Sequence, residues 1–293
     1  MVKFLLGEKL ARNILLGLKS KKARGLSLAV IQVGDNPVSL KYIAEKEKAA
    51  KDLDIGFRLM LYPNNVSETI LVKAVQKIGK NPKVSGMIVQ LPLPKHLNTQ
   101  LILDAIPPHK DVDVLSSFSF AEFVFGALSI LPPTVAAIAL LIKETLRQSS
   151  GQAKRNLEGT QVAVVGAGRL VGLPVSLWLT QQGAIVSLIQ KGTRNAPQLI
   201  KKADIVVSGV GKAGLITGTM IKKGSVIIDA GTSVESGPST SLRVKKIQGD
   251  VDFKSVSKKA GYLSPVPGGV GPLTVACLFQ NLFSLSRRKF NAT

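Results

Sequence analysis

The sequence predicts an α/β fold with two domains, and three observations support this prediction. The chain has 293 residues, more than one typical domain holds. Apolar residues make up 45% and charged residues 19%, a balance typical of a globular protein with a buried core. Short strand-like segments alternate with helical segments along the chain, and this alternation is typical of parallel sheets covered by helices.

The first domain is expected at residues 1–128. Asn36 and Pro37 mark one helix start, because Asn caps the first turn and Pro is favoured inside it. Apolar residues at helical spacing predict the other helices. Short apolar runs that end at Gly or Pro predict the strands. We predict helices at residues 5–19, 36–52, 67–77 and 97–105, and strands at 26–33, from 56 onward and at 85–90.

The second domain is expected at residues 129–271, after a boundary near 125–133. The segment 147–158 is polar and is expected to be an exposed connection. A last helix, within residues 272–293, is expected to pack back on the first domain. We predict strands at 161–165, 184–189, 204–208 and 225–229, and helices at 170–183 and 273–283.

Composition excludes several classes of protein. A single cysteine, Cys277, rules out a framework of disulfides within the chain. The most apolar stretch, residues 118–142, is interrupted by Glu122 and two prolines, and its longest remaining run, 135–142, is far below the roughly 20 residues that span a membrane. Charged residues also interrupt the apolar segment 1–21, so no export signal is expected. We therefore expect a cytoplasmic protein without membrane contact.

The net charge of +21 is unusual, because 39 Lys and Arg stand against 18 Asp and Glu. Such a charge attracts polyanions, so nucleic acid is one candidate partner. The basic residues are spread along the chain, however, and aromatic residues are only 5%. These two features disfavour nucleic acid and favour either a solvated lysine-rich surface or the steering of anionic small molecules.

A glycine-rich turn predicts a dinucleotide site. The strand at 161–165 runs directly into Gly166-Ala167-Gly168, and a helix follows near Gly172. Glycine permits a tight turn and a close approach of the backbone to a pyrophosphate, and the N-terminus of the helix offers free N–H groups. Glycines punctuate many ordinary turns, but here the strand, the helix and a second strand stand at the expected spacing.

The end of the second strand favours NADP over NAD. An NAD site usually places a carboxylate there to bind the ribose hydroxyls. This chain instead has Lys191 and Arg194, two cations suited to a 2′-phosphate, although a solvated basic loop would look the same. Further glycine-containing turns follow the later strands. They add Gly209, Gly211 and Thr232 to the expected cofactor contacts.

Four side chains in the first domain are candidates for substrate chemistry. Tyr42 and Lys46 are four residues apart and so share one face of a helix. Gln90 closes a buried strand, and Asp113 lies in a loop after two prolines. A Pro- and Gly-rich loop at 265–272 comes late in the chain. Taken singly, each has an ordinary explanation: a surface lysine, a capping amide, a turn aspartate or a plain loop.

Together and in this order, these motifs resemble the methylenetetrahydrofolate dehydrogenase/methenyltetrahydrofolate cyclohydrolase family. The resemblance covers residues 26–276. Its specific segments are Val-Gly-Asp-Asn-Pro at 33–37, Val-Gln-Leu-Pro-Leu-Pro at 89–94, Lys-Asp-Val-Asp at 110–113 and Pro-Val-Pro-Gly-Gly-Val-Gly-Pro at 265–272.

The resemblance implies a homodimeric, bifunctional enzyme of one-carbon metabolism. It would oxidise 5,10-methylenetetrahydrofolate with NADP and then hydrolyse the methenyl product to 10-formyltetrahydrofolate. It implies that Lys46 acts in hydrolysis, that Gln90 sets its protonation state, that Tyr42 stacks on the folate and that Asp113 binds the pterin N–H groups. Pro265, Gly268 and Gly269 would border the folate.

The sequence also departs from the family pattern near both expected sites. Val114 stands where the family commonly has Gly, and Val135 replaces the Pro of a Cys-Thr-Pro triplet. Ala167-Gly168 replaces Arg-Ser, Gln190 replaces His, and Thr232-Ser233 replaces Ile-Asn. Two alternatives stay open: a dehydrogenase without hydrolysis, and a non-catalytic nucleotide- or nucleic-acid-binding protein with the same fold. No metal site is expected, because His96 and His109 lack a ligand cluster.

Overall fold

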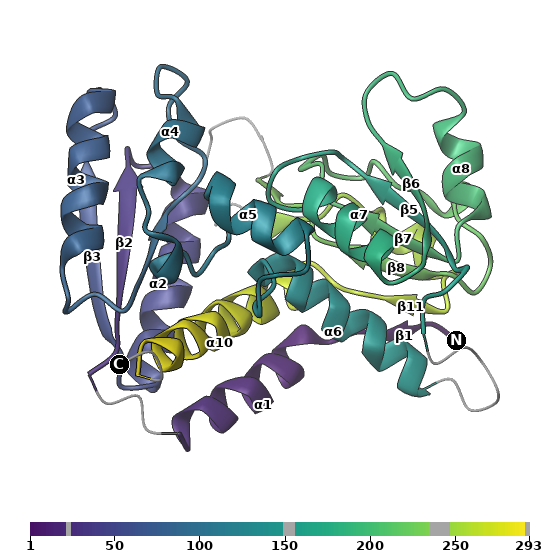
Figure 1. Ribbon diagram of the computed structural model, residues 1–293. Helices are drawn as coiled ribbons and strands as arrows, with labels where there is room; N and C mark the ends of the chain where they lie inside the picture. The colour runs from purple at the N-terminus through teal and green to yellow at the C-terminus, as the bar shows by residue number, and fades with distance from the viewer. Residues whose placement is uncertain (22–24, 149–155, 235–246, 291–293) are drawn as a thin grey trace, which may run out of the picture. The chain divides into compact units, whose positions relative to one another are not determined.

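The computed structural model describes residues 1–21, 25–148, 156–234 and 247–290 (Figure 1). The chain forms two compact units. One contains a three-stranded sheet and comprises Ala11–Pro133 with Val275–Thr293; we call it the three-stranded unit. The other contains a six-stranded sheet and comprises Met1–Leu10 with Thr134–Thr274; we call it the six-stranded unit.

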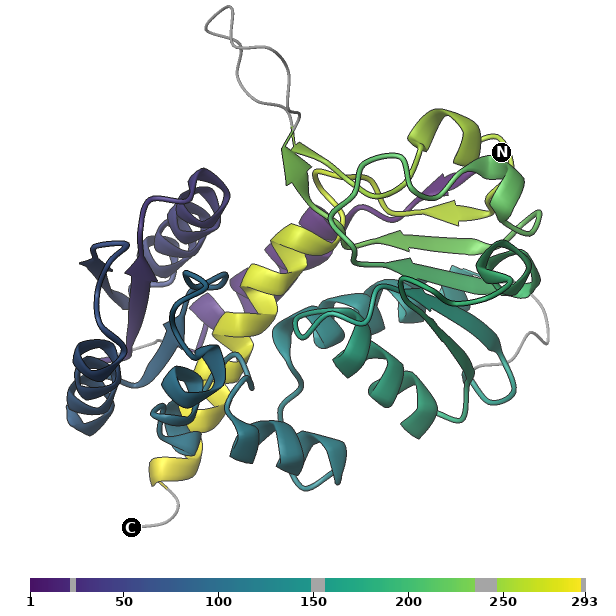
Figure 2. The same cartoon turned by 90° about the horizontal axis from the view of Figure 1, so that it is seen from above.

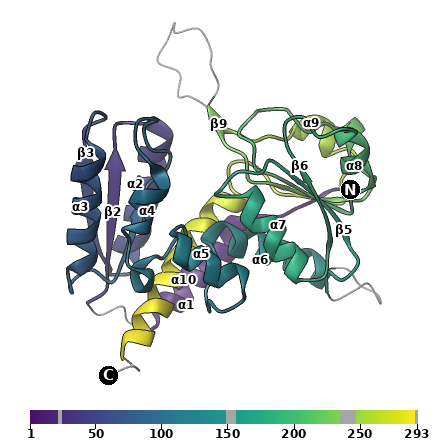
Figure 3. The ribbon, with the colours of Figure 1, turned by 45° about the horizontal axis from the view of Figure 1, so that its top comes forward.

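The three-stranded unit is built on a parallel sheet with β2 in the centre. Ile31 of β2 pairs with Met60 on one side and Val89 on the other. Every residue of β2 is buried, which explains the apolar run at 28–31 in its centre. Helices flank this sheet (Figure 3). The elements are β2 (Ser27–Val33), α2 (Pro37–Asp52), β3 (Gly56–Tyr62), α3 (Glu68–Lys80), β4 (Gly86–Val89), α4 (Thr99–Asp104), the 3-10 turn η1 (Pro108–Lys110) and α5 (Ser117–Val124).

Side-chain caps explain where these helices begin. The Asn36 side chain accepts hydrogen bonds from the backbone N–H groups of Val38 and Ser39, so α2 starts at the predicted position. Ser67, Asn98 and Ser116 accept one such bond each at the starts of α3, α4 and α5. Each cap satisfies an N–H group that has no partner inside the helix.

Lys110 is a buried lysine with a structural role. Its ammonium donates to the carbonyl oxygens of Gly79 (2.6 Å) and Asn81 (2.7 Å), at the C-terminal end of α3. The next residue, Asp111, accepts from the backbone N–H of Ser116 at 2.8 Å. The first two residues of the Lys-Asp-Val-Asp motif therefore shape the loop that carries Asp113.

The last helix, α10 (Val270–Phe290), contributes its part from Val275 onward to the three-stranded unit. The Asn281 side chain donates to the carbonyl oxygens of Val112 (2.9 Å) and Leu131 (2.8 Å). These bonds satisfy two polar groups in apolar surroundings and tie the helix to the loop before Asp113.

The six-stranded unit has the strand order β1-β11-β8-β7-β5-β6, and its described pairings are parallel. Because β5 lies between β6 and β7, the chain crosses over β5 on its way from β6 to β7. Ligands of such sheets bind at this reversal of strand order, beyond the carboxyl ends of the strands. The central elements are α6 (Pro133–Gln148), β5 (Gln161–Val165), α7 (Gly172–Gln181), β6 (Ile185–Ile189), α8 (Ala196–Lys202), β7 (Ile205–Ser208), η2 (Gly218–Met220) and β8 (Val226–Asp229).

Several short elements of this unit escaped prediction. The strand β1 (Lys3–Phe4) pairs with β11 (Tyr262–Leu263) at the edge of the sheet (Figure 2). Residues 1–10 therefore belong to the six-stranded unit, whereas the sequence analysis assigned them to the first domain. A strand of two residues has no readable periodicity, so only its pairing reveals it. The short elements β9 (Ser233–Val234), β10 (Ile247–Gln248) and α9 (Phe253–Val256) were not predicted either. The helix α1 (Gly7–Lys19), in contrast, lies within the predicted range 5–19.

Candidate active site and cofactor site

The side chains of Lys46 and Gln90 meet in the three-stranded unit, although 44 residues separate them in sequence. Lys46 lies on α2, is only 8% exposed, and its ammonium donates to Gln90 Oε1 at 2.7 Å. Gln90 follows β4, and its backbone N–H donates to the Ile31 carbonyl at 2.8 Å, which holds it at the carboxyl end of the sheet. Its amide nitrogen donates to the Leu91 carbonyl at 3.0 Å. The Gln90 oxygen is therefore oriented toward Lys46.

Asp113 is electrostatically coupled to Lys46. Burial lowers the pKa of Lys46 from its ordinary value, and the negative charge of Asp113 acts against this by raising it. Burial raises the pKa of Asp113 to about 6, while the charge of Lys46 lowers it and that of Asp111 raises it. A buried amine with a lowered pKa and a nearby carboxyl group is suited to proton transfer near neutral pH.

Tyr42 lies on α2 one turn before Lys46, as their spacing predicted, and its side chain is partly buried. Val114, next to Asp113, has a backbone φ of 59° and is fully buried. A β-branched residue is strained in this left-handed region, at a cost of about 1–2 kcal/mol. Glycine adopts this conformation without strain, so the backbone explains why glycine suits this position.

The glycine turn predicted to bind a dinucleotide lies between β5 and α7 in the six-stranded unit. Gly166 follows β5 with a φ of 97°. A Cβ on Gly172 would lie 1.6 Å from the Gly166 carbonyl oxygen, so only glycine lets the start of α7 pack against the turn. A Cβ on Gly168 would meet nothing within 4 Å. Ala167 is partly buried and Gly168 is exposed, so the middle of the turn is accessible to solvent.

Lys191 and Arg194 lie in the turn after β6, and both side chains are exposed. The turn is closed by reciprocal bonds between Gln190 and Thr193: the Gln190 N–H donates to the Thr193 hydroxyl, and the Thr193 N–H donates to the Gln190 carbonyl, both at 3.0 Å. Because β6 is the neighbour of β5, these cations are at the position where such folds bind the adenosine ribose.

The loop after β7 lies against the glycine turn. A Cβ on Gly209 would lie 2.5 Å from the side chain of Val171, and one on Gly166 would lie 3.0 Å from the Gly209 carbonyl oxygen. A Cβ on Gly211 would lie 3.4 Å from the Thr232 carbonyl oxygen. The structure thus brings together three of the segments that the sequence assigned to the cofactor.

Two buried carboxylates in the same unit were missed by the sequence analysis. Asp229 is the last residue of β8, and Asp250 follows β10; they are 3% and 0% exposed. The adjacent glycines Gly231 and Gly249 are the available sequence signal, because a Cβ at either would collide with one of the carboxyl groups.

The Pro- and Gly-rich loop at 265–272 belongs to the six-stranded unit. Its Gly268 has a φ of 103°, and its carbonyl oxygen accepts hydrogen bonds from the N–H groups of Gly7 (2.9 Å) and Glu8 (3.3 Å) at the start of α1. A Cβ on Gly269 would lie 2.6 Å from the Pro265 carbonyl oxygen. These glycines are therefore needed by contacts within the unit itself.

Within the described residues, no group of three or more His, Cys, Asp or Glu side chains is arranged to hold a metal ion. None of the helices in the described ranges is long and apolar enough to cross a membrane. Cys277 lies on α10, and burial raises the pKa of its thiol to about 12, as expected for a core residue.

The fold, the glycine turn at 166–172 and the buried group of Lys46, Gln90 and Asp113 define a class of protein. It is a two-domain α/β protein in which one domain has a nucleotide-binding parallel sheet and the other a buried lysine. Comparison with known proteins makes the assignment specific. Residues 5–113 match the model for the catalytic domain of tetrahydrofolate dehydrogenase/cyclohydrolase, and residues 132–290 match the model for its NAD(P)-binding domain. The chain belongs to the tetrahydrofolate dehydrogenase/cyclohydrolase family.

Relatives cover nearly the whole chain. The bifunctional protein FolD of Thermodesulfovibrio yellowstonii is 40% identical over 281 residues, which are 94% of this chain and 93% of that protein. The crystal structure of FolD from Campylobacter jejuni is 33% identical, with a TM-score of 0.88 over 99% of this chain and all of that one. FolD of Trypanosoma brucei, solved with NADP and an inhibitor, is 30% identical, with a TM-score of 0.89 over 99% of this chain and 98% of that one.

Proposed function

We propose that this chain oxidises 5,10-methylenetetrahydrofolate to the 5,10-methenyl compound with NADP and then hydrolyses that product to 10-formyltetrahydrofolate. The observation that carries the proposal is the Lys46–Gln90 hydrogen bond of 2.7 Å beside Asp113, in a chain that also has an NAD(P)-binding domain. The bifunctional relatives support both activities.

For hydrolysis, we assign Lys46 as the base. Its lowered pKa makes the neutral amine accessible, and a cationic methenyl substrate beside it favours that form further. Water bonds to the methenyl carbon as its proton passes to the Lys46 nitrogen. The new hydroxyl then gives up its proton as the C=O bond forms and the bond from this carbon to one folate ring nitrogen breaks, and that nitrogen takes up a proton. Gln90 holds the amine in place through its side-chain oxygen.

For substrate binding, we assign Tyr42 and Asp113. Tyr42 presents a ring from the same helix as Lys46, and a ring at this position is suited to stacking on the folate. The Asp113 carboxylate is suited to accept hydrogen bonds from the pterin N–H groups. Pro265, Gly268 and Gly269 are proposed to border the folate. The assignments of Tyr42 and Asp113, together with those of Lys46 and Gln90, account for all four side chains of the sequence prediction.

The dehydrogenase step requires NADP, which accepts the hydride when bound. The tight turn, in which Gly172 packs against Gly166 and Gly168 is exposed, is suited to the close approach of a diphosphate to the backbone. We assign the diphosphate to the turn at 166–168 with Gly172, and the 2′-phosphate to Lys191 and Arg194. The loops carrying Gly209, Gly211 and Thr232 complete the proposed cofactor site.

The test uses purified protein, 5,10-methylenetetrahydrofolate and either NADP or NAD. We expect NADPH to form, the methenyl absorbance to rise and fall, and formyl-folate to accumulate. NADPH without formyl-folate would indicate the dehydrogenase that lacks hydrolysis. A salt-dependent gel shift with nucleic acid and no folate turnover would favour the non-catalytic alternative.

We also propose that the protein is a cytoplasmic homodimer and that its charge of +21 steers the anionic cofactor and folate rather than nucleic acid. The dimer rests on the family resemblance, and the location on the charged residues that interrupt the apolar segment 1–21. Light scattering after size-exclusion chromatography would measure the mass in solution, and a mass of one chain of 31.1 kDa would contradict the dimer.

The pH dependence of hydrolysis tests the coupling of Asp113 to Lys46. In the Asp113→Asn variant, the charge that raises the pKa of Lys46 is gone, so this pKa falls further. The neutral amine then persists to lower pH, and the acid limb of kcat/KM for methenyl hydrolysis is expected to shift to lower pH. Glu45→Gln, at an exposed position on the same helix, serves as the control and is expected to leave the limb in place. A shift to higher pH would contradict the coupling.

A further inference from the structure

Two carboxylates are buried near the carboxyl ends of the neighbouring strands β7 and β8. Asp229 ends β8 and pairs in register with Ser208, which ends β7. Asp250 is fully buried and approaches the same edge from the segment after β10. Neither residue has a role in the reaction proposed above. Burial of a carboxylate costs folding free energy unless hydrogen bonds replace those to water. The hydrogen-bond partners of each carboxylate therefore show which segment it holds in place.

Asp250 holds the loop that follows β7. Its Oδ2 accepts from the Ser208 hydroxyl and from the Val210 N–H, both at 2.7 Å. Its Oδ1 accepts from the Lys212 N–H, also at 2.7 Å. Short bonds to an ionised acceptor are strong and directional. Each carboxylate oxygen therefore fixes a different point of the loop 209–212.

Asp229 in turn holds Asp250. Its two oxygens accept from the N–H groups of Asp250 (3.0 Å) and Val251 (2.9 Å), and one of them also accepts from Gly231 (3.0 Å). Burial raises the pKa of Asp229 to about 6, although these backbone bonds lower it. A Cβ on Gly231 would lie 2.1 Å from the Asp250 carboxyl carbon, so this glycine makes room for the carboxylate.

The loop that Asp250 holds is the one that lies against the dinucleotide turn. Gly209 contacts Val171 and Gly166 on one side, and Gly211 approaches Thr232 on the other. A shift of the loop would therefore disturb the proposed diphosphate turn and the segment around Thr232 together. The chain of contacts runs from Asp229 through Asp250 and the loop 209–212 to Gly166.

We propose that Asp250 is a positioning residue for the dinucleotide cofactor. Asp250 holds the loop 209–212 in place against the glycine turn at 166–172. This inference rests on the proposed function, because it takes Gly209 and Gly211 as cofactor contacts. Asp250 acts through the backbone of the loop, since its oxygens are occupied by Ser208, Val210 and Lys212. Its effect is on NADP binding and on the dehydrogenase step, and not on hydrolysis.

The test is Asp250→Asn, which preserves volume but replaces one acceptor oxygen with an NH₂ group. That group cannot accept from an N–H of the loop, so one anchor point is lost. We expect NADP, measured by calorimetry, to bind about 30-fold more weakly, and dehydrogenase kcat/KM to fall by a similar factor. Hydrolysis of added methenyltetrahydrofolate is expected to stay at the wild-type rate, because Lys46, Gln90 and Asp113 belong to the other unit.

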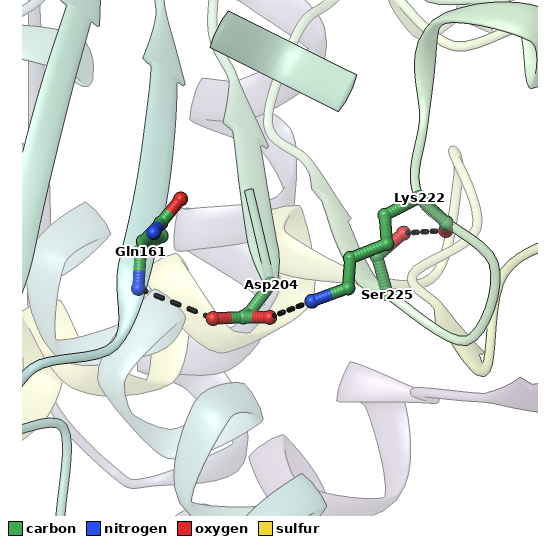
Figure 4. Close-up of polar contacts among 4 residues, drawn as sticks. All are labelled: Gln161, Asp204, Lys222 and Ser225. Carbon is green, nitrogen blue, oxygen red and sulfur yellow. Dashed lines mark hydrogen bonds and ion pairs between the residues drawn. The ribbon is translucent and has the colours of Figure 1, made fainter. Parts of the chain in front are cut away.

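The matched control is Asp204→Asn, at the amino end of β7, the strand whose carboxyl end carries Ser208. Asp204 precedes β7, and its carboxylate binds the Lys222 ammonium at 2.6 Å and the Gln161 N–H at 3.3 Å (Figure 4). It is half-exposed and far along the strand from the loop 209–212. We expect Asp204→Asn to bind NADP as the wild type does.

Ser208→Ala is the milder second variant, because it removes one of the three bonds to Asp250 and keeps the backbone intact. About threefold weaker NADP binding is expected. The inference is overturned if Asp250→Asn binds NADP normally, or if it loses hydrolysis in parallel with NADP binding. Should that variant not fold, unchanged NADP binding by Ser208→Ala overturns it. A wild-type protein that neither binds NADP nor turns over folate would instead refute the proposed function.

Discussion

Replacing Lys46 with methionine is expected to reduce hydrolysis of 5,10-methenyltetrahydrofolate by at least about 100-fold, within the range typical for loss of a general base. Methionine keeps much of the buried aliphatic chain but has no amine to accept the proton from water. The Gln90 oxygen loses its 2.7 Å hydrogen bond at the same time. The measurement is the initial rate of loss of methenyl absorbance, corrected for the reaction without enzyme.

NADP binding by the Lys46→Met variant should equal that of the wild type, since Lys46 belongs to the three-stranded unit and the dinucleotide turn to the other. Lys48→Met is the matched control: Lys48 is exposed on the same helix, so its loss changes charge without touching the buried pair. Hydrolysis at the wild-type rate by Lys46→Met would remove Lys46 from its assigned role, whatever the dehydrogenase rate.

Reversing both cations after β6, with Lys191→Glu and Arg194→Glu, is expected to weaken NADP binding by about 100-fold and NAD binding by less than about threefold. The two cofactors differ by one 2′-phosphate, so only NADP loses its attraction to these side chains and gains repulsion from the new carboxylates. Both side chains are exposed, so the variant should keep its fold. Calorimetry with each cofactor at low ionic strength gives the ratio directly, because salt screens exposed charges.

The matched control for this charge change is Lys201→Glu with Lys202→Glu. Both residues are exposed at the end of α8, so this variant alters the net charge of the unit equally without altering the turn after β6. If steering by net charge alone governs NADP binding, the two double variants will behave alike. Equal losses for NADP and NAD in Lys191→Glu/Arg194→Glu would refute the assignment of the 2′-phosphate.

Much of the fold was predictable because its signals are local. The buried strand β2 contains the apolar run 28–31, and the helix α2 begins after the cap residue Asn36 because the cap and the proline stand side by side. The glycine turn at 166–172 was predictable for the same reason, since Gly166 has a positive φ and a Cβ on Gly172 would collide with the Gly166 carbonyl oxygen, six residues before it. The two-residue strand β1 was not, because its only evidence is its pairing with β11, more than 250 residues later in the chain.

By itself, the sequence determined the alternation of strands and helices, the glycine turn, the family and the identity of the candidate residues. Tertiary structure alone decided which polar groups share a bond: Lys46 with Gln90 across 44 residues, and Ser208 with Asp250 across 42. It also decided that Lys110 is a buried anchor and that Val114 bears a strained backbone. The physical reason is that burial and hydrogen-bond partners depend on segments distant in the chain, whereas caps, turns and periodicity depend on near neighbours.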